Sequence, residues 1–154
     1  MKSAARYLIP AGISLMAWSG PFWFIPPSAP LWLSSLNLPA TVPGPLAAAI
    51  IWSVCGLLCG LAYAWTSLRF NNRALVLTVV FGLMLLFAVS SNIAFFNLQN
   101  PLLALCNLII LEFLIIYFQY HAFYIMAASS YILLPCAIWV AYAIYANIFV
   151  ILLN

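Results

Sequence analysis

The residue that most clearly could do chemistry is Glu112, the single acidic side chain of the chain. It lies near the middle of an apolar run over residues 101–124. A carboxyl group at that depth of a bilayer is costly unless it is protonated, paired or in contact with water, and such groups are functional by default. We interpret Glu112 as a polar or proton-carrying site, with a neutral bystander as the alternative. Its candidate polar neighbours are Ser90, Ser91, Asn92 and Asn107.

The remaining reactive side chains form no recognisable catalytic or metal-binding arrangement. His121 is expected near a helix end, where an interfacial histidine is favoured over a haem ligand. Cys55 and Cys59 share one helix face, but two thiols without further ligands do not make a metal site. With Cys106 and Cys136, they are interpreted as buried packing residues. The chain has no paired carboxylates and no phosphate loop, so we predict no hydrolytic or ATP-driven chemistry and no catalytic residue.

The tryptophans point instead to binding. Trp52 and Trp139 lie inside apolar segments, where an indole N–H needs a partner. Together with Trp18, Trp23 and Trp32 they are candidates to line a flat, apolar pocket. A plain core role is the alternative for each of them taken singly.

The composition sets the environment in which these residues act. Hydrophobic residues make up 69% of the 154 residues and charged residues 3%. A soluble domain carries about a quarter charged residues. The chain is therefore predicted to be a multi-pass integral membrane protein, and its net charge of +3 gives no reason to expect nucleic-acid binding.

Five apolar segments are long enough to span the bilayer, which takes about 20 helical residues. We predict one all-α domain over residues 1–154, a bundle of five helices with a long loop at about 23–44. The helices are expected at about 5–22, 45–68, 74–96, 101–124 and 129–152. Prolines in and around the loop are expected to keep it out of regular helix. These prolines are Pro21, Pro26, Pro27, Pro30, Pro39 and Pro43.

The basic residues predict the orientation in the membrane. Lys2 and Arg6 precede the first helix, and Arg69 and Arg73 join the second and third. All four fall on one side of the bilayer, which the positive-inside rule places in the cytoplasm. The N-terminus is expected inside and the C-terminus outside. The basic start of the chain, without a targeting extension, favours a bacterial cytoplasmic membrane.

A stripe of small residues runs along the second expected helix at Gly56, Gly60 and Ala64. Such stripes let helix backbones approach closely in lipid. Packing within the bundle is the favoured interpretation, and a homodimer contact is the alternative.

The loop and the last helix carry motifs that resemble a known family. The loop motif consists of Leu36, Asn37, Pro39, Pro43 and Trp52; the C-terminal motif consists of Pro135, Trp139 and Asn147; Phe95 and Phe96 close the third helix. With these motifs, over essentially its whole length, the chain resembles the TspO/MBR family of translocator proteins and tryptophan-rich sensory proteins. The resemblance implies five membrane helices and a ligand pocket beneath the loop.

Carried over to this sequence, the resemblance predicts the ligand-binding residues. They are Trp32, Asn37, Pro39, Pro43, Trp52, Met84, Ala88, Ser91, Trp139, Ala143 and Asn147. Several positions that are bulky or polar in the family are altered here: Ala40, Thr41, Leu46, Gly56, Met84, Ala88, Ser91 and Cys136. The sterol-recognition motif near the C-terminus is also absent, because no Lys or Arg follows Arg73.

The leading hypothesis is a membrane sensor or transport-type protein that binds a flat hydrophobic ligand, either a tetrapyrrole or an isoprenoid or sterol-like lipid. No obligatory cofactor is expected, and porphyrin or haem would be a ligand. Expected partners are membrane lipid, a second copy of the chain or another membrane protein. The alternative is a non-catalytic accessory subunit that has lost the pocket. A porphyrin-degrading enzyme, implied only by the resemblance, ranks last.

Overall fold

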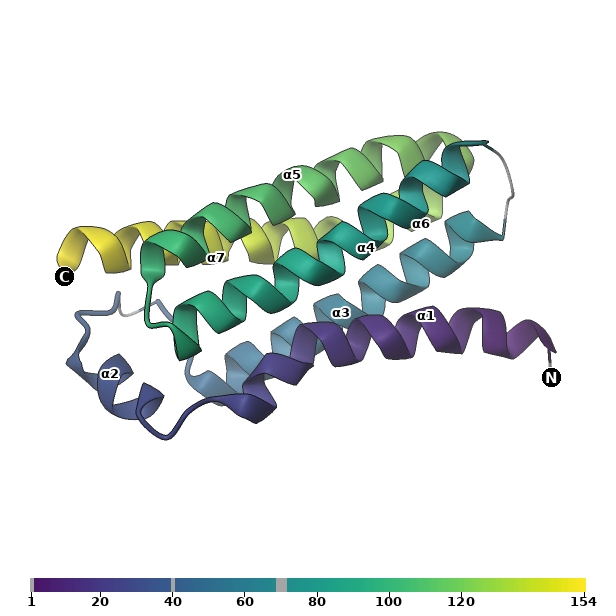
Figure 1. The fold of residues 1–154 in the computed structure, drawn as a ribbon. Helices are drawn as coiled ribbons and strands as arrows, with labels where there is room; N and C mark the ends of the chain where they lie inside the picture. The colour runs from purple at the N-terminus through teal and green to yellow at the C-terminus, as the bar shows by residue number, and fades with distance from the viewer. Residues whose placement is uncertain (1, 40, 69–71) are drawn as a thin grey trace.

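The computed structural model describes residues 2–39, 41–68 and 72–154 and is helical throughout its regular structure (Figure 1). The first part comprises α1 (Lys2–Ser19), the 3-10 helix η1 (Gly20–Phe24), α2 (Ala29–Ser35) and α3 (Pro45–Ser67). The second part comprises α4 (Asn72–Asn92), the π-helix η2 (Ile93–Asn97), α5 (Pro101–Ile125), α6 (Ala127–Ile132) and α7 (Leu134–Leu153).

The helices form a transmembrane bundle, as the sequence predicts. Four stretches of the described chain are each long and apolar enough to cross a bilayer: Pro45–Ser67, Leu75–Asn97, Pro101–Ile125 and Ala127–Leu153. A fifth is present if Ala4–Phe24 and Ala29–Ser35, which meet at 82°, count as one broken span. The protein is therefore an integral, multi-pass membrane protein.

Prolines open three of the long helices. Pro45 begins α3, Pro101 begins α5, and Pro135 lies in the first turn of α7. At these positions the missing N–H has no helical partner to lose, and φ is already suited to the helix. The Asn100 side chain accepts a hydrogen bond from the Leu103 N–H over 3.0 Å and so caps α5.

The structure corrects two expectations about regular structure. The loop was expected to avoid helix, yet α2 forms within it because Pro30 sits in its first turn, where proline is tolerated. The final helix was expected to be continuous, yet it breaks at Leu133. Pro135 cannot donate the hydrogen bond that a continuous helix needs, so α6 and α7 are separate elements.

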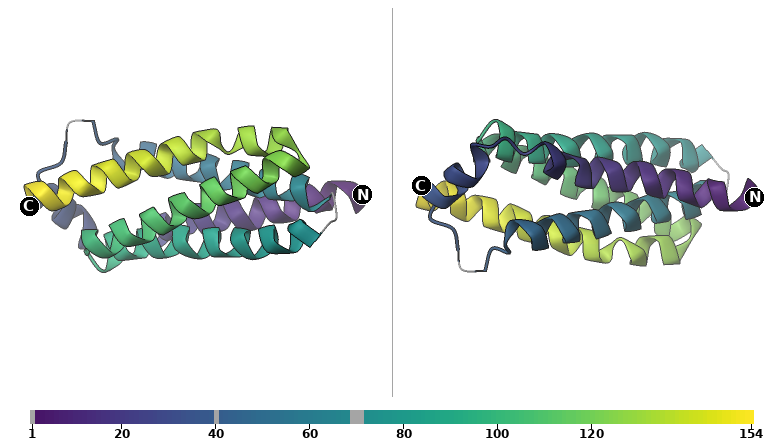
Figure 2. Two further views of the ribbon diagram at one scale, coloured as in Figure 1. Left: turned by 90° about the horizontal axis from the view of Figure 1, so that it is seen from above. Right: turned by 90° about the horizontal axis from the view of Figure 1, so that it is seen from below.

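The two ends of the bundle differ in what they carry. The start of α1, the end of α3 and the start of α4 lie together at one end, while α2 and the C-terminal end of α7 lie at the other (Figures 1 and 2). The orientation prediction places Lys2, Arg6, Arg69 and Arg73 at the first end. Arg6 is exposed, and Arg69 lies outside the described residues. Ala40 of the loop also lies outside them.

The small-residue stripe is used inside the chain. A Cβ added at Gly60 would lie 2.5 Å from both the Ala11 Cα and the Pro10 carbonyl oxygen. One added at Gly56 would lie 2.7 Å from the Trp18 Cβ. Because α1 occupies this face of α3, the favoured interpretation of packing within the bundle accounts for the stripe. We call this contact the α1–α3 seam.

Candidate functional site

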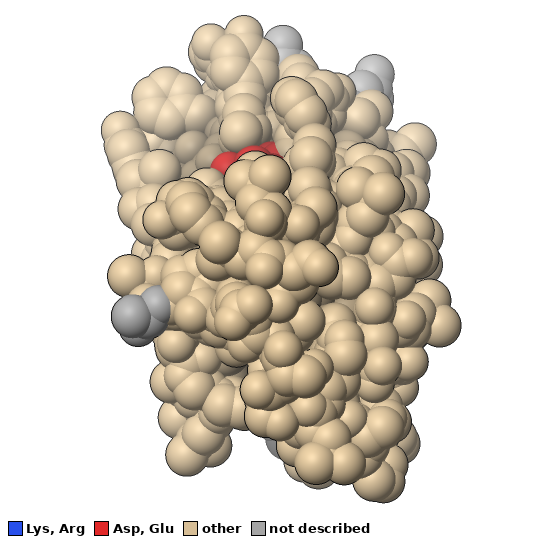
Figure 3. Space-filling view, turned by 90° about the vertical axis from the view of Figure 1, so that its left-hand side faces the viewer, with Lys and Arg blue, Asp and Glu red and all other residues tan. Residues whose placement is uncertain are grey.

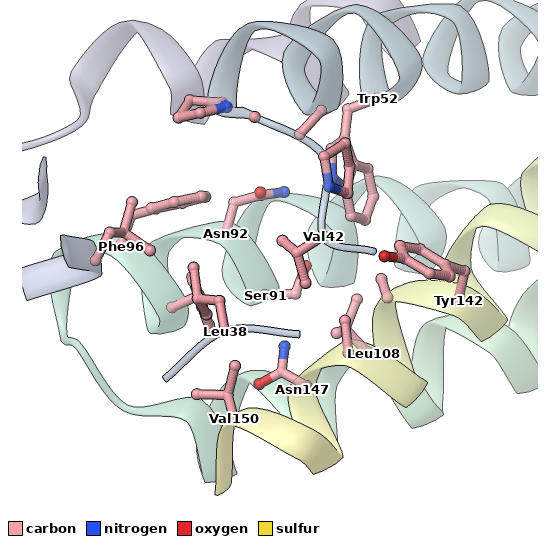
Figure 4. Close-up of a pocket in the computed structure, with 18 of the residues that line it drawn as sticks. Leu38, Val42, Trp52, Ser91, Asn92, Phe96, Leu108, Tyr142, Asn147 and Val150 are labelled. Carbon is pink, nitrogen blue, oxygen red and sulfur yellow. The ribbon is translucent and has the colours of Figure 1, made fainter. Parts of the chain in front are cut away.

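A cavity of about 370 Å³ lies between the loop and the halves of α3, α4 and α7 that are nearest to it (Figure 4). Trp52 projects from α3 on one side, and Asn147 and Val150 of α7 lie opposite it. Leu38 and Val42 line the cavity on the side of the loop. Its other lining residues include Ser91, Asn92, Phe95, Phe96, Leu108, Trp139, Tyr142 and Ala143. The volume falls in the range of small-molecule sites, about 300–1,000 Å³.

Two polar atoms at this site have no hydrogen-bond partner among the described residues. They are the Asn147 Oδ1 and the Trp139 Nε1, and both are buried. The other nearby polar groups are satisfied within their own helix: the Ser91 hydroxyl and the Asn92 amide donate to the Ala88 carbonyl oxygen over 3.0 and 2.8 Å. A buried polar atom normally has a partner, so Asn147 and Trp139 each carry a polar atom that the described chain leaves unsatisfied.

Aromatic rings form one wall of the cavity. Trp52 and Trp139 meet edge to face with ring centroids 6.3 Å apart, and Tyr142 stacks on Trp139 at 5.5 Å. Behind them Trp18, which is fully buried, contacts Trp52 at 5.2 Å. Such contacts hold the rings in fixed positions, so the wall is rigid.

Hydrogen bonds fasten the loop to α7. The Tyr142 hydroxyl donates to the Thr41 carbonyl oxygen over 2.8 Å. The Asn37 N–H donates to the Asn154 Oδ1 over 2.8 Å, and the Asn37 amide donates to the Leu153 carbonyl oxygen over 3.3 Å. In return, the Asn154 amide donates to the Asn37 carbonyl oxygen at 3.5 Å. We call the Asn37–Asn154 contact the asparagine clamp. All of these bonds are exposed, so they attach the loop as a lid over the cavity and are not part of the buried core.

Aromatic contacts hold the other edge of the lid. Trp32 of α2 packs edge to face on Phe95 at 5.1 Å, and Phe22 packs on Phe96 at 5.6 Å. The Asn97 amide donates to the Phe24 carbonyl oxygen over 3.2 Å. These partners come from η2, whose π-helical turn follows the buried part of α4.

The structure gathers six of the eleven predicted ligand-binding residues around the cavity. They are Pro43, Trp52, Ser91, Trp139, Ala143 and Asn147. Met84 and Ala88 are fully buried in the core instead. Trp32 and Asn37 do not line the cavity but hold the loop in place, through Phe95 and Asn154 respectively. Pro39 does not line the cavity either. Among the other tryptophans, Trp18 is in the core and Trp23 is 81% exposed.

Sequence reasoning did not assign a role to several lining residues. Tyr142, Ala146 and Val150 follow Trp139 at helical spacing on α7, so the periodicity of that helix could have identified them. Leu38 and Val42 come from the loop and carried no such signal, because the course of a loop is set by its tertiary contacts.

Glu112 is not joined to the polar residues expected around it. The side chain is half-buried on α5, one turn from Leu108, and its buried Oε2 has no partner among the described residues. Seen from the loop end, the acidic side chain shows as a small red patch in a recess, and no blue Lys or Arg side chain is visible among the described residues (Figure 3). Its assignment as a polar or proton site remains a prediction.

The other reactive groups do not assemble into a site. Cys55, Cys59 and Cys136 are buried free thiols, whereas Cys106 is exposed, so the expectation of a buried packing residue is wrong for Cys106. His121 packs against Tyr117 at 4.4 Å. Within the described chain, no three His, Cys, Asp or Glu side chains come together as metal ligands would.

Comparison with known proteins agrees with this architecture. The TspO/MBR family matches residues 8–153 of the chain. The chain is also 25% identical over 137 residues to the tryptophan-rich protein TspO of Chlorobaculum tepidum. That match covers 85% of this chain and 84% of the relative.

Proposed function

This chain belongs to the TspO/MBR family, and from that premise we propose that its cavity binds a flat hydrophobic ligand for sensing or transport. The candidate ligands are tetrapyrroles and isoprenoid or sterol-like lipids. The bound molecule would lie against the Trp52–Trp139 wall, beneath the loop that acts as a lid.

The observation that carries the proposal is the pair of polar atoms without a partner, on two residues that line a mostly apolar cavity. Ligand sites are mostly apolar, with a few polar groups that fix orientation. Here Asn147 Oδ1 offers an acceptor and Trp139 Nε1 offers a donor, and neither has a partner within the described chain. A ligand that carries a hydroxyl or N–H group and a carbonyl or hydroxyl oxygen would satisfy both.

Within this class, the lining favours a neutral ligand. It contains no Lys, Arg or His among the described residues. A carboxylate held in such a cavity would lose its hydration without gaining a cation, which is strongly unfavourable. An isoprenoid or sterol-like alcohol therefore suits the cavity better than a tetrapyrrole whose propionate groups are enclosed. A tetrapyrrole would need to leave these groups at the loop side, outside the lining.

Tryptophan emission tests the proposal. Titration with a sterol alcohol and, separately, with protoporphyrin should change the emission of the wild-type protein in nanodiscs, and the change should saturate. The Trp52→Phe and Trp139→Phe variants should lose most of the change, because these rings form the wall. The Trp65→Phe variant, which alters an indole at the opposite end of α3, is the matched control. An unchanged signal at saturating amounts of both ligands contradicts the proposal.

The accessory-subunit alternative retains one argument, namely the replacement of bulky family residues by Thr41, Leu46 and Ser91. Its other argument was the small-residue stripe, which α1 occupies within the chain. Co-purification of one stoichiometric membrane protein, together with the absence of ligand binding, would favour it.

The proposal includes a cellular setting. The basic residues at one end favour a bacterial cytoplasmic membrane with the N-terminus inside and the lid and C-terminus outside. The ligand, membrane lipid and a second copy of the chain are the proposed partners. No obligatory cofactor enters the proposal, and haem or porphyrin would act as a ligand.

A further inference from the structure

The segment Gly20–Ser35, formed by η1, its proline turn and α2, carries large apolar side chains that the fold leaves uncovered. We call it the interfacial hairpin. Trp23, Phe24 and Leu31 are 81%, 79% and 76% exposed. The hairpin is nevertheless fixed in place, because Ala29 is fully buried and Trp32 packs on Phe95. The outward apolar side chains are therefore a stable feature of the surface.

The direction of α2 relates this surface to the membrane. The axis of α2 makes an angle of 82° with the preceding helical segment, Ala4–Phe24. If α1 spans the bilayer, α2 lies nearly parallel to the membrane plane at the loop end of the bundle (Figure 1). Trp and other large apolar residues at the end of a span are typical of the layer between water and hydrocarbon.

Charge and polarity place the hairpin in that layer. No charged side chain occurs between Arg6 and Arg69 in the sequence, so a neutral surface suits the hairpin. Polar groups are present on it too: Ser35 is exposed, and Gln99 donates to the Ser28 hydroxyl over 3.4 Å. A segment with both kinds of group fits the bilayer interface better than water or hydrocarbon alone. Its apolar surface also continues that of α1, where Met16 is 74% exposed.

We propose that the interfacial hairpin is a membrane anchor, with Trp23, Phe24 and Leu31 inserted among the headgroups and upper acyl chains of a zwitterionic bilayer. The inner side of the same hairpin, at Leu33 and Ser34, lines the cavity. The anchor thus fixes the lid to the membrane, and it does so whether or not the cavity binds a ligand.

Quenching of Trp23 in nanodiscs tests the anchor. The emission of Trp23 is obtained by subtracting the Trp23→Phe variant from the wild type. In phosphatidylcholine brominated near the top of the acyl chains, this difference should lose most of its intensity, while aqueous iodide should leave most of it. The Trp32→Phe difference is the matched control, because Trp32 lies on the same hairpin but faces Phe95, and bromolipid should quench it less.

A second variant addresses the anchor without removing the probe. Replacement of Phe24 and Leu31 by Ser removes apolar side chains that are largely exposed, so the bundle should stay folded. Trp23 should then shift towards quenching by iodide. Strong iodide quenching in the wild type would overturn the proposal. So would insensitivity of Trp23 to both quenchers, because it would mean that protein, such as a second copy, covers the hairpin.

Discussion

The α1–α3 seam and the loop end of the bundle differ in how closely their helices pack. At the seam, glycine lets two backbones meet so closely that a Cβ at Gly60 would lie 2.5 Å from backbone atoms of α1. At the loop end, helices α3, α4 and α7 enclose a cavity of about 370 Å³, and exposed hydrogen bonds hold the lid. The seam is closely packed, whereas the loop end contains a cavity that the chain itself does not fill.

The difference separates stability from binding. In lipid, helices associate through close packing and hydrogen bonds rather than through hydrophobicity, so the seam is where stability is concentrated. The loop end gives up packing contacts and leaves Asn147 and Trp139 with unpaired polar atoms. Substitutions at the seam should therefore change folding, whereas substitutions at the loop end should change ligand affinity and exchange.

The largest effect is expected at Gly60. Replacement by Ala forces a Cβ against the backbone of Ala11 and Pro10, which cannot move as a flexible side chain can, so unfolding should become easier by about 2–3 kcal/mol. Reversible unfolding in mixed micelles measures this change. Gly82→Ala is the matched control: a Cβ added at Gly82 would meet nothing within 4 Å, and its replacement should be neutral or slightly stabilising. Equal destabilisation by both variants would contradict the close contact at Gly60 as the source of the effect.

Asn147→Leu should separate binding from stability. The substitution removes a buried acceptor that has no partner within the described chain, so the stability of the ligand-free protein should stay equal or rise. Affinity for a ligand with a hydroxyl group should fall about tenfold, corresponding to about 1.4 kcal/mol for the lost hydrogen bond. Calorimetric titration and unfolding measure the two quantities. Ser91→Ala is the control with little expected effect on affinity, since that hydroxyl already donates to Ala88.

The asparagine clamp should control exchange more than affinity. Asn37→Ala removes one hydrogen bond, from its side chain to the Leu153 carbonyl oxygen, whereas Asn154→Ala removes the two bonds between its side chain and the Asn37 backbone. Exposed bonds of this kind are worth about 0.5–1.5 kcal/mol each. The ligand dissociation rate should rise several-fold in each single variant. In a double-mutant cycle, the two effects should be less than additive, because both substitutions loosen the same attachment of the Asn37 segment to the end of α7. Fully additive effects would mean that the clamp does not act as a unit.

The smallest effect is expected for Tyr142→Phe. This change removes one hydrogen bond, to the Thr41 carbonyl oxygen, and keeps the ring that stacks on Trp139. Ligand dissociation should speed up by less than in the clamp variants, with unchanged unfolding. Stopped-flow displacement measures the rate. An increase larger than that of Asn154→Ala would place the main attachment of the lid at Tyr142.

The sequence was most informative where local rules decide the structure. Pro45 and Pro101 marked helix starts correctly, and the spacing of Gly56 and Gly60 indicated a close helix contact. These predictions succeeded because helix starts and helix faces depend on neighbouring residues. Trp52, Trp139 and Asn147 line the cavity, but they were identified through the family resemblance, and their role in ligand binding stays a prediction.

The lid could not be predicted in the same way. The asparagine clamp joins residues 117 positions apart, and nothing local to Asn37 indicates its partner. The formation of α2 depends on where Pro30 falls relative to the helix start, which the proline content alone did not show. Likewise, Met84 and Ala88 lie on the same helix face as Ser91 but further from the loop end, where the core and not the cavity meets that face.

Native mass spectrometry of the protein, released gently from membranes and then supplied with a neutral sterol alcohol, tests the central claim most directly. We predict one ligand mass per chain in the wild type, retained at activation energies that strip detergent, and a large loss of this species in Trp52→Phe and Asn147→Leu. A wild-type protein that stays free of ligand at saturating concentrations, or variants that retain it fully, would contradict the assignment of the cavity as a binding site.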